Sequence, residues 1–560
     1  MSKKNINTSN AEAVEEKVDE VSPVSEKRGE LIEHSVVTVL SAILLIVCSF
    51  IKNENVKRWL YTISFVVSGY EILYSVIVKL SKKEVIIEEI AVVAGSLVLL
   101  YSDYGKYACL IIIAYSLIAF SKKVFEYIAL SKSERLSVEA GYETDEKIKQ
   151  SLGIRSENLK TMLEEMPNSI IYGKKFRLIF GLAGLFIGLA IMFISPIFSK
   201  IGYVDALKDK WLVCGALVVA LWQCASVCVF NAINYFSACL AADKYEATFG
   251  SFAAIDKLAA SDEIAFDGAG VLTEKSLSIT SVDSANVENT LSALYSIESG
   301  IDEYIRSAVS VYAKNNGISL SDIPFENIKR FETLGVTADF GNERYVVGNK
   351  KLLKKVFDIS VEDDGDGSVI FLAKDNALLG KINYNRIEKS NVAGEIKELA
   401  DDAGMSVTLL SSDKLSVVNS MKDKFLLDKA VAGASTKYKA DYVKKSDAIY
   451  VGDSEYDAET IKLLCGECVT VGGGKVYENG LTVSGNDVRQ IPVAVKIAKR
   501  TLKKKKFITF FTAVVKAAAI LAGVITFAVI GKYAWISVLG CIAADAISLI
   551  SAATNLSDPA

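Results

Sequence analysis

The chain has 560 residues, of which 51% are hydrophobic and 23% charged, and its mean hydropathy of +0.31 is too high for an ordinary soluble protein. The formal net charge of -4 excludes the basic footprint of a nucleic-acid-binding protein, so we expect no nucleic-acid partner. The composition therefore predicts a chain that is partly embedded in a membrane, with the lipid bilayer as a partner, and partly soluble.

Residues 1–30 are rich in Glu, Lys, Asn and Ser and predict a disordered N-terminal tail, with no cleavable signal peptide before the first apolar run. The apolar stretches that follow are long enough to cross a bilayer and lie near 33–51, 58–79, 85–101, 105–121, 177–198, 211–241, 507–530 and 533–553. They are grouped four, two and two, which predicts a multi-pass α-helical membrane domain of about eight helices: helices 1–4 in residues 31–121, helices 5–6 in 177–241 and helices 7–8 in 503–557.

Lysines flank the predicted spans at 122–123, 174–175 and 503–506, and this bias predicts that both termini and the soluble parts are cytoplasmic. We expect an integral, multi-pass protein of the plasma membrane. Residues 122–176 predict a short helical cytoplasmic loop that is too small for a catalytic domain.

Between the sixth and seventh spans, short apolar runs alternate with helical stretches such as Glu388–Asp402, which predicts an α/β domain with a Rossmann-like parallel sheet. Its expected core strands are Glu263–Asp267, Ser368–Leu372, Ser406–Leu410, Ala448–Asp453 and Cys468–Val471. A change of pattern inside this region predicts an inserted α+β domain over 280–373, so the α/β domain comprises 242–279 and 374–502.

Several expected strands end in polar residues, and in an open parallel sheet ligands bind at the carboxyl ends of the strands. Asp267 ends one strand and is followed by Gly-Ala-Gly, whose backbone amides are suited to a phosphoryl group; the alternative is a residue that only initiates the turn. The other polar residues expected at this edge are Ser411, Asp413, Asp453 and Asp457.

These residues form a chemically consistent set for phosphate chemistry. A carboxylate such as Asp267 can attack phosphorus, while Ser411 and Lys439 offset phosphate charge. Asp267, Asp453 and Asp457 are the candidate Mg²⁺ ligands, because Mg²⁺ prefers carboxylate oxygens.

The motifs resemble the haloacid-dehalogenase-like phosphoryl-transfer fold, and specifically the P-type ATPases of the heavy-metal (CPx) class, over residues 31–557. Asp267 lies where that family's Asp-Lys-Thr-Gly-Thr-Leu-Thr has its phosphorylated Asp. Other positions that match family motifs are Gly270, Leu272 and Thr273, Ser411 to Asp413 for Thr-Gly-Asp, Lys439 for the phosphate-binding lysine, and Gly452, Asp453 and Asp457 for the hinge motif. The resemblance implies that Asp267, Ser411 and Lys439 are catalytic.

The resemblance also implies cofactors and a transported ion. Mg²⁺ and ATP would be the cofactors, with the nucleotide held by Gly335, Gly348, Asn349 and Asp413. A transition metal such as Zn²⁺ would be the substrate, and its path would include Cys224, Cys228, Lys516 and Asp545. The alternatives are that Lys516 and Asp545 pair with each other or reach toward an interface, and that the two cysteines only pack.

The chain departs from the family at four places. Gly268, Ala269 and Val271 replace the Lys and Thr residues of the phosphorylation motif, and the segment 301–304 lacks the histidine that stacks on adenine, which argues against ATP binding of the family's kind. Residues 197–323 contain no proline, so the sixth span lacks the family's Cys-Pro-Cys motif, although Cys224 and Cys228 at helical i, i+4 spacing could still present two thiols to one face. The loop 122–176 stands in place of the actuator domain.

Three functions remain open from the sequence. The chain could descend from an ATP-driven transition-metal transporter and be impaired or uncoupled in pumping; it could be a pseudo-pump that regulates or partners another protein; or it could be a membrane-tethered, Mg²⁺-dependent phosphatase that uses Asp267. The surviving set of Asp267, Ser411, Lys439, Asp453 and Asp457 favours retained phosphate chemistry.

Overall fold

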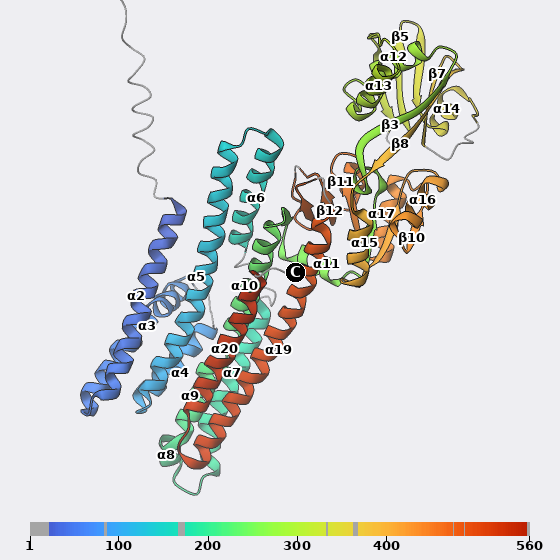
Figure 1. Cartoon of the computed structure of the whole chain (residues 1–560). Helices are drawn as coiled ribbons and strands as arrows, with labels where there is room; N and C mark the ends of the chain where they lie inside the picture. The colour runs from blue at the N-terminus through green and yellow to red at the C-terminus, as the bar shows by residue number, and fades with distance from the viewer. Residues whose placement is uncertain are drawn as a thin grey trace, which may run out of the picture. The chain divides into compact units, whose positions relative to one another are not determined.

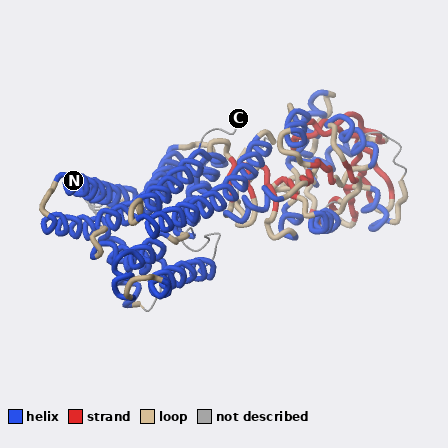
Figure 2. The backbone as a smooth tube through the Cα atoms, turned by 90° about the horizontal axis from the view of Figure 1, so that it is seen from below, coloured by secondary structure: helices blue, strands red, loops and turns tan. Residues whose placement is uncertain are grey.

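The computed structural model describes residues 22–82, 87–165, 174–331, 334–361, 368–473, 475–485 and 488–556. The chain divides into a helical unit, Met1–Ala241 with Arg500–Ala560, and a mixed unit, Ala242–Lys499 (Figure 1). Among the described residues, strands occur only in the mixed unit, as the red segments of Figure 2 show.

The helical unit confirms the predicted multi-pass helical membrane domain. Its long helices and short helical segments are α2 (Pro23–Phe50), α3 (Glu54–Ser81), α4 (Ile87–Tyr101), α5 (Gly105–Tyr142), α6 (Glu146–Glu165), α7 (Lys174–Ile194), η1 (Ser195–Phe198), α8 (Tyr203–Ala206), η2 (Leu207–Trp211), α9 (Leu212–Leu221), α10 (Ala225–Asp243), α19 (Gln490–Ile530), α20 (Trp535–Ala553) and η4 (Thr554–Leu556). Over the described residues, 7 helical spans are long and apolar enough to cross a membrane. The third predicted span forms α4, which has 15 residues and falls short of that length.

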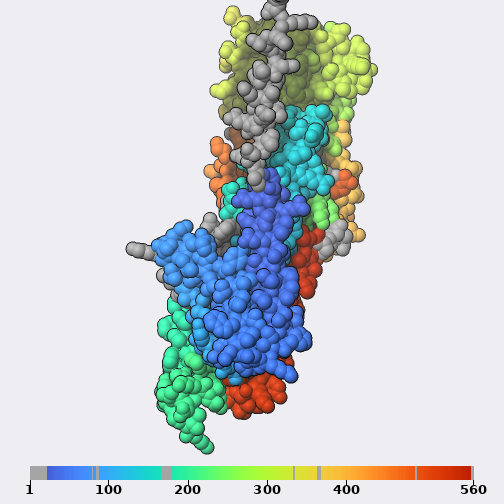
Figure 3. Space-filling model, turned by 90° about the vertical axis from the view of Figure 1, so that its left-hand side faces the viewer, coloured from blue at the N-terminus to red at the C-terminus, as the bar shows by residue number. Residues whose placement is uncertain are grey.

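Apolar side chains on the outside of the helical unit account for its high hydropathy. The α2 residues Ile32, Val36, Val39, Ile43, Ile46 and Phe50 are all exposed. In Figure 3, α2 and α3 (blue) cover one face of this unit. Such a surface is stable in lipid and costly in water, so the helical unit requires a bilayer.

The sixth span consists of two helices and not of one. α9 ends at Leu221, and α10 begins at Ala225, so Trp222–Cys224 is non-helical although it contains no proline. The cause is tertiary: the buried carboxylate of Glu88 on α4 accepts a hydrogen bond from the backbone N–H of Cys224 at 3.1 Å. A side-chain acceptor thus satisfies an amide that the helix would otherwise have to pair.

The predicted loop 122–176 is a helical hairpin as far as it is described. α5 continues from its apolar part to Tyr142, and α6 returns along it. Ser133 and Ser156 exchange buried hydrogen bonds, and Leu136, Leu159 and Leu240 form an apolar cluster that joins the hairpin to α10.

The mixed unit contains a seven-stranded sheet that confirms the predicted α/β fold. Its strands, in spatial order, are β1 (Ala247–Phe249), β13 (Leu481–Val483), β12 (Cys468–Val471), β11 (Ile449–Asp453), β2 (Glu263–Phe266), β9 (Ser406–Leu410) and β10 (Lys429–Val431). All neighbours pair in parallel except β1 with β13. Apart from the edge strand β10, the strands are almost continuously buried, as parallel strands covered on both faces require.

The helices of this α/β part alternate with its strands. They are α11 (Phe252–Ala260), α15 (Val392–Asp401), α16 (Leu415–Phe425), α17 (Thr436–Ser446) and α18 (Ala458–Leu463). β2 lies between β11 and β9, so the chain segments that follow these three strands leave the sheet at one edge. This edge positions the candidate site.

The second sheet is antiparallel, with the order β3 (Thr273–Ser284), β8 (Ala377–Glu388), β7 (Ser368–Lys374), β6 (Glu343–Gly348), β5 (Gly335–Phe340) and β4 (Glu326–Phe331). Its helices are α12 (Val287–Ile297), α13 (Glu303–Asn315) and α14 (Lys350–Phe357). The assignment of Ser368–Leu372 to the α/β core is wrong, because β7 pairs with β6 and β8. An apolar run alone does not tell which sheet will bury it.

Candidate functional site

Asp267 directly follows β2 at the carboxyl edge of the parallel sheet, and its side chain is buried. Its backbone N–H donates to the Val451 carbonyl at 2.9 Å, which ties it to β11. Its Oδ1 accepts from the Gly268 N–H at 2.8 Å, so Asp267 also makes the turn contact that was the alternative to a functional role. Gly270 has φ +75°, and a Cβ there would lie 3.0 Å from the Asp453 Cβ, so the loop needs glycine at this position.

Lys439, on α17, joins two carboxylates in the buried interior of this edge. Its Nζ lies 2.8 Å from Asp267 Oδ2 and 3.2 Å from Asp457 Oδ1. Burial alone would lower the pKa of Lys439, but the charges of Asp267 and Asp457 outweigh it and the pKa is raised. Burial, together with the charge of Asp267, holds the pKa of Asp457 well above its usual range.

Asp453 ends β11 and is fully buried beside this trio. Its Oδ1 accepts from the Glu455 and Tyr456 N–H groups at 2.9 and 3.1 Å. Its Oδ2 lies 3.0 Å from the Nζ of Lys275, an ion pair that lacks hydrogen-bond geometry. Lys275 is on β3, two residues beyond Thr273, and its sequence pattern did not predict it as a site residue.

Ser411 follows β9 and lies at the same edge of the parallel sheet as Asp267. Its hydroxyl donates to Asp413 Oδ2 at 3.0 Å, and a Cβ built on Gly268 would lie 3.3 Å from the Ser411 Oγ. The predicted residues Asp267, Ser411, Lys439, Asp453 and Asp457 therefore lie at one edge of the sheet. The position of Asp413 beside Ser411 places it at this edge too.

Two further basic residues at this edge were missed, and both come from the end of β8 or just after it. Arg386 Nε lies 3.9 Å from Asp413 Oδ2. Lys389 is buried and donates to the Gly270 carbonyl at 2.7 Å, which holds the loop after Asp267. Basic residues at the start of the expected helix 388–402 were the available signal, but the partner of Lys389 is more than one hundred residues away in the chain.

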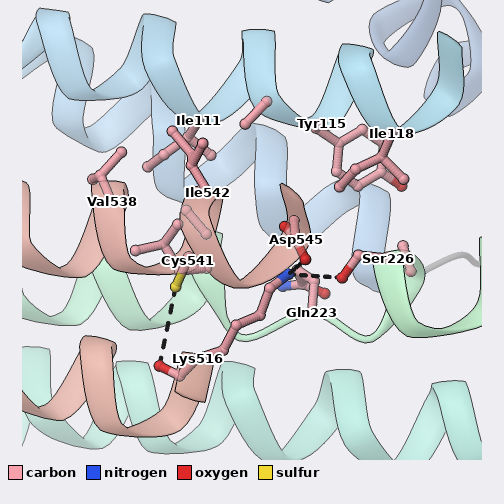
Figure 4. A pocket seen from close by; sticks show the side chains of 14 residues that line it. Ile111, Tyr115, Ile118, Gln223, Ser226, Lys516, Val538, Cys541, Ile542 and Asp545 are labelled. Carbon is pink, nitrogen blue, oxygen red and sulfur yellow. Dashed lines mark hydrogen bonds and ion pairs between the residues drawn. The ribbon is translucent and has the colours of Figure 1, made fainter. Parts of the chain in front are cut away.

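The helical unit contains a separate polar site around Lys516 (Figure 4). The Nζ of Lys516, on α19, lies 2.7 Å from Asp545 Oδ1 on α20 and donates to Ser226 Oγ on α10 at 2.7 Å. These residues and Gln223 line a cavity of about 40 Å³ that is otherwise largely apolar. The predicted alternative of mutual Lys516–Asp545 pairing is thus what the structure shows, and a role in an ion path stays a prediction.

Cys224 lies in the break of the sixth span and donates its thiol hydrogen to Glu88 Oε1 at 2.7 Å. Cys228 lies one turn further, on α10, and interacts with the Cys224 thiol. Glu88 was missed, although an acidic residue inside an apolar stretch is itself a signal. The structure therefore places the Glu88 carboxylate and the Cys224 thiol in contact at a helix break.

Known proteins with related sequences are heavy-metal transporters. The chain is 25% identical over 259 residues to a copper-exporting P-type ATPase of Staphylococcus epidermidis, covering 43% of this chain and 32% of the relative. It is 24% identical over 269 residues to the cadmium/zinc-transporting ATPase HMA2 of Arabidopsis thaliana, which covers 45% of this chain and 28% of the relative. It is 22% identical over 364 residues to a probable cadmium-transporting ATPase of Alkalihalophilus pseudofirmus, which covers 60% of this chain and 49% of the relative.

The chain is a homologue of the heavy-metal P-type ATPases. No family model matches it, and it aligns with less than half the length of these relatives. A zinc-transporting PIB-type ATPase solved in an E2·Pi state has the same fold, with a TM-score of 0.55 and 13% identity over 94% of this chain and 100% of that one.

In the segment predicted to be an inserted nucleotide-binding-like domain, Gly335, Gly348 and Asn349 have structural roles. Gly335 and Gly348 face each other across β5 and β6. A Cβ on Gly335 would lie 2.1 Å from the Val347 carbonyl oxygen, so close backbone approach accounts for this glycine. Asn349 caps α14, since its side chain accepts from the Lys351 and Leu352 N–H groups. Nucleotide binding by these residues stays a prediction.

The phosphorylation site of a P-type ATPase works with Mg²⁺, and the carboxylates of this chain as placed do not fit that ion. Both oxygens of Asp267, Asp453 and Asp457 already face an ammonium group or accept from an N–H group. Among the residues that the structure describes, no group of three or more His, Cys, Asp and Glu side chains is arranged to hold a metal ion.

Proposed function

We propose that the chain is a phosphate-binding membrane protein, derived from a heavy-metal P-type ATPase, in which the Asp267 site is uncoupled from ion pumping. The observation that carries the proposal is the buried network in which Lys439 contacts both Asp267 and Asp457. A buried ammonium at a strand edge is suited to a phosphoryl oxyanion. A chain that had lost all phosphate chemistry would have no need to keep this costly polar cluster buried.

Three features favour loss of coupling. Gly268, Ala269 and Val271 offer no side-chain donor to a transferred phosphate, and each such donor is worth about 10²- to 10³-fold in rate elsewhere. Gly335 and Asn349 are accounted for by backbone packing and helix capping. The described part of 122–176 is a two-helix hairpin that packs on α10.

The test is a phosphorylation assay on the full chain in detergent. The protein is incubated with radiolabelled ATP and Mg²⁺, with and without Zn²⁺ or Cu⁺, and acid-stable label is compared with Asp267→Asn. Asp262→Asn, an exposed carboxylate at the other end of β2, is the matched control. We expect no label that Zn²⁺ or Cu⁺ stimulates. Metal-stimulated label that Asp267→Asn alone removes would contradict the proposal.

Phosphate binding is measured in parallel with orthovanadate, which mimics a phosphoryl group. We expect vanadate to stabilise the wild type against hydrogen exchange around β2 and β11, and Asp267→Asn to abolish or weaken this effect. Absence of vanadate binding would favour the pseudo-pump hypothesis, in which the protein regulates or partners another protein. Hydrolysis of a phosphomonoester that depends on Asp267 would favour the phosphatase reading.

A second candidate function, transition-metal binding in the membrane, is favoured by the break in the sixth span. The break places Cys224 and Glu88 together, and Lys516 with Asp545 lines a cavity close to Gln223 of the same break. Zn²⁺ prefers thiolate and carboxylate ligands of this kind. The substrates named for the relatives, copper, cadmium and zinc, belong to the same class of ion.

Zn²⁺ bound to purified protein is counted by equilibrium dialysis and elemental analysis. We expect Cys224→Ser to lower bound Zn²⁺ by about one ion per chain, whereas Cys48→Ser, a buried cysteine of α2 outside the break, leaves it unchanged. Equal binding in the two variants would contradict the membrane site.

A further inference from the structure

Lys275 forms a poorly exposed ion pair with Asp453, one of the candidate Mg²⁺ ligands. Its Nζ is 3.0 Å from Asp453 Oδ2 and 2.6 Å from Glu455 Oε2. The Asp453 side chain is fully buried and that of Lys275 is 11% exposed, so water screens the pair poorly.

The surroundings hold the ammonium group in place. It lies 6.0 Å from the centroid of the Tyr304 ring and 5.7 Å from that of Tyr456, two contacts of the cation–π type. Two carboxylates and two aromatic rings therefore surround one positive charge.

The two ammonium groups also offset most of the negative charge of the buried set without a metal. Asp267, Asp453 and Asp457 contribute at most three negative charges, while Lys439 and Lys275 contribute two positive ones. Adding Mg²⁺ while Lys275 remains would bring two cations to the same Asp453 oxygen, which is unfavourable in a site screened this weakly.

We propose that the Lys275 ammonium group takes the place of Mg²⁺ beside Asp453, so that the site binds phosphate between Lys439 and Lys275 without a divalent ion. This inference rests on the phosphate-binding function proposed above. Lys275 is a binding residue in this account: its charge stabilises the bound oxyanion, and no bond forms or breaks on it.

The first arm of the test uses Mn²⁺ alone, a paramagnetic substitute for Mg²⁺, and counts bound ions by electron paramagnetic resonance. The variants are Lys275→Met, Lys275→Met with Asp453→Asn, and Lys429→Met as an exposed lysine control on β10. We expect no Asp453-dependent Mn²⁺ site in the wild type or in Lys429→Met. Lys275→Met should gain such a site, and the double variant should lose it.

Two results in this arm would overturn the inference. One is a wild-type Mn²⁺ site as tight as that of Lys275→Met and dependent on Asp453. The other is failure of Lys275→Met to gain any site, which would mean that Lys275 is not what excludes the ion. Lys275→Gln is a second variant in case the first does not fold, and near-ultraviolet circular dichroism checks the fold of each.

The second arm measures orthovanadate affinity in EDTA and in Mg²⁺. The wild type should bind equally in both, whereas Lys275→Met should bind at least about tenfold more weakly in EDTA and recover in Mg²⁺. A wild type that binds vanadate only with Mg²⁺ overturns the inference and leaves the proposed function standing. If no variant binds vanadate while the Mn²⁺ pattern holds, the proposed function fails and the replacement of Mg²⁺ by Lys275 stands.

Discussion

Replacing Lys439 with Met removes the charge that Asp267 and Asp457 share. At the observed distances of 2.8 and 3.2 Å, each attraction amounts to roughly 5 to 6 kcal/mol at an effective dielectric constant of about 20. Desolvation of the three groups offsets most of this in the wild type, but the variant leaves two buried carboxylates facing each other. Breaking a buried pair in this way costs about 3 to 5 kcal/mol.

Hydrogen exchange is the suitable assay, because all four tryptophans (Trp59, Trp211, Trp222 and Trp535) lie in the helical unit and cannot report on the mixed unit. Amides of β2 and β11 should exchange at least about 100-fold faster in Lys439→Met, since about 1.4 kcal/mol is a factor of ten. Amides of β4, β5 and β6 of the second sheet, which carry none of the residues of the site, provide the internal reference.

Two control variants test whether the effect of Lys439→Met comes from the lost charge. Lys437→Met changes an exposed lysine of the same helix and should leave β2 and β11 unchanged. Adding Asp457→Asn to Lys439→Met removes one stranded charge and should restore at least half of the lost protection. Exchange in Lys439→Met that stays within about threefold of the wild type would refute the reasoning, because the network would then contribute no stability.

Three further predictions concern single side chains. Glu298 is buried, and burial together with the charge of Asp302 raises its pKa to about 8. The folded state therefore holds a proton that the unfolded state releases. The free energy of unfolding should fall by up to about 1.4 kcal/mol per pH unit between about pH 4.5 and 8. Glu298→Gln should remove this fall when exchange of α12 amides is followed against pH, and parallel pH profiles would contradict it. Gly270→Ala places a Cβ 3.0 Å from the Cβ of Asp453 at a backbone φ of +75°. The substitution should destabilise the loop by about 1 to 3 kcal/mol and weaken vanadate binding. An unchanged vanadate affinity would show that the loop adapts. Glu88→Ala leaves the buried Cys224 N–H without its acceptor and should cost about 1 to 3 kcal/mol, measured as a lower melting temperature in detergent, whereas Glu88→Gln should cost less; equal losses would mean that the charge and not the acceptor matters.

The sequence was sufficient to predict the membrane helices, the parallel sheet and the grouping of Asp267, Ser411, Lys439, Asp453 and Asp457. Each of these depends on a local pattern: long apolar runs, alternation of strands and helices, and polar residues at strand ends. Parallel strands then bring their carboxyl ends together without further information.

What the sequence could not predict depends on contacts between distant segments. The break at Trp222–Cys224 follows from Glu88 on α4, because its carboxylate pairs the Cys224 amide, and no proline marks the position. Lys275 reaches Asp453 only through the path that β3 takes as it leaves the site. β7 has the apolar pattern of a core strand, and only its pairing with β6 and β8 shows that it belongs to the second sheet.

The central claim is that the Asp267 site no longer drives ion movement, and transport into proteoliposomes tests it most directly. Purified wild type and Asp267→Asn are reconstituted at equal density, and Zn²⁺ uptake is followed with ATP and Mg²⁺ present outside. The account predicts that the two proteins take up Zn²⁺ at the same rate, with no increase when ATP is added. ATP-dependent Zn²⁺ uptake by the wild type that is lost in Asp267→Asn would contradict it.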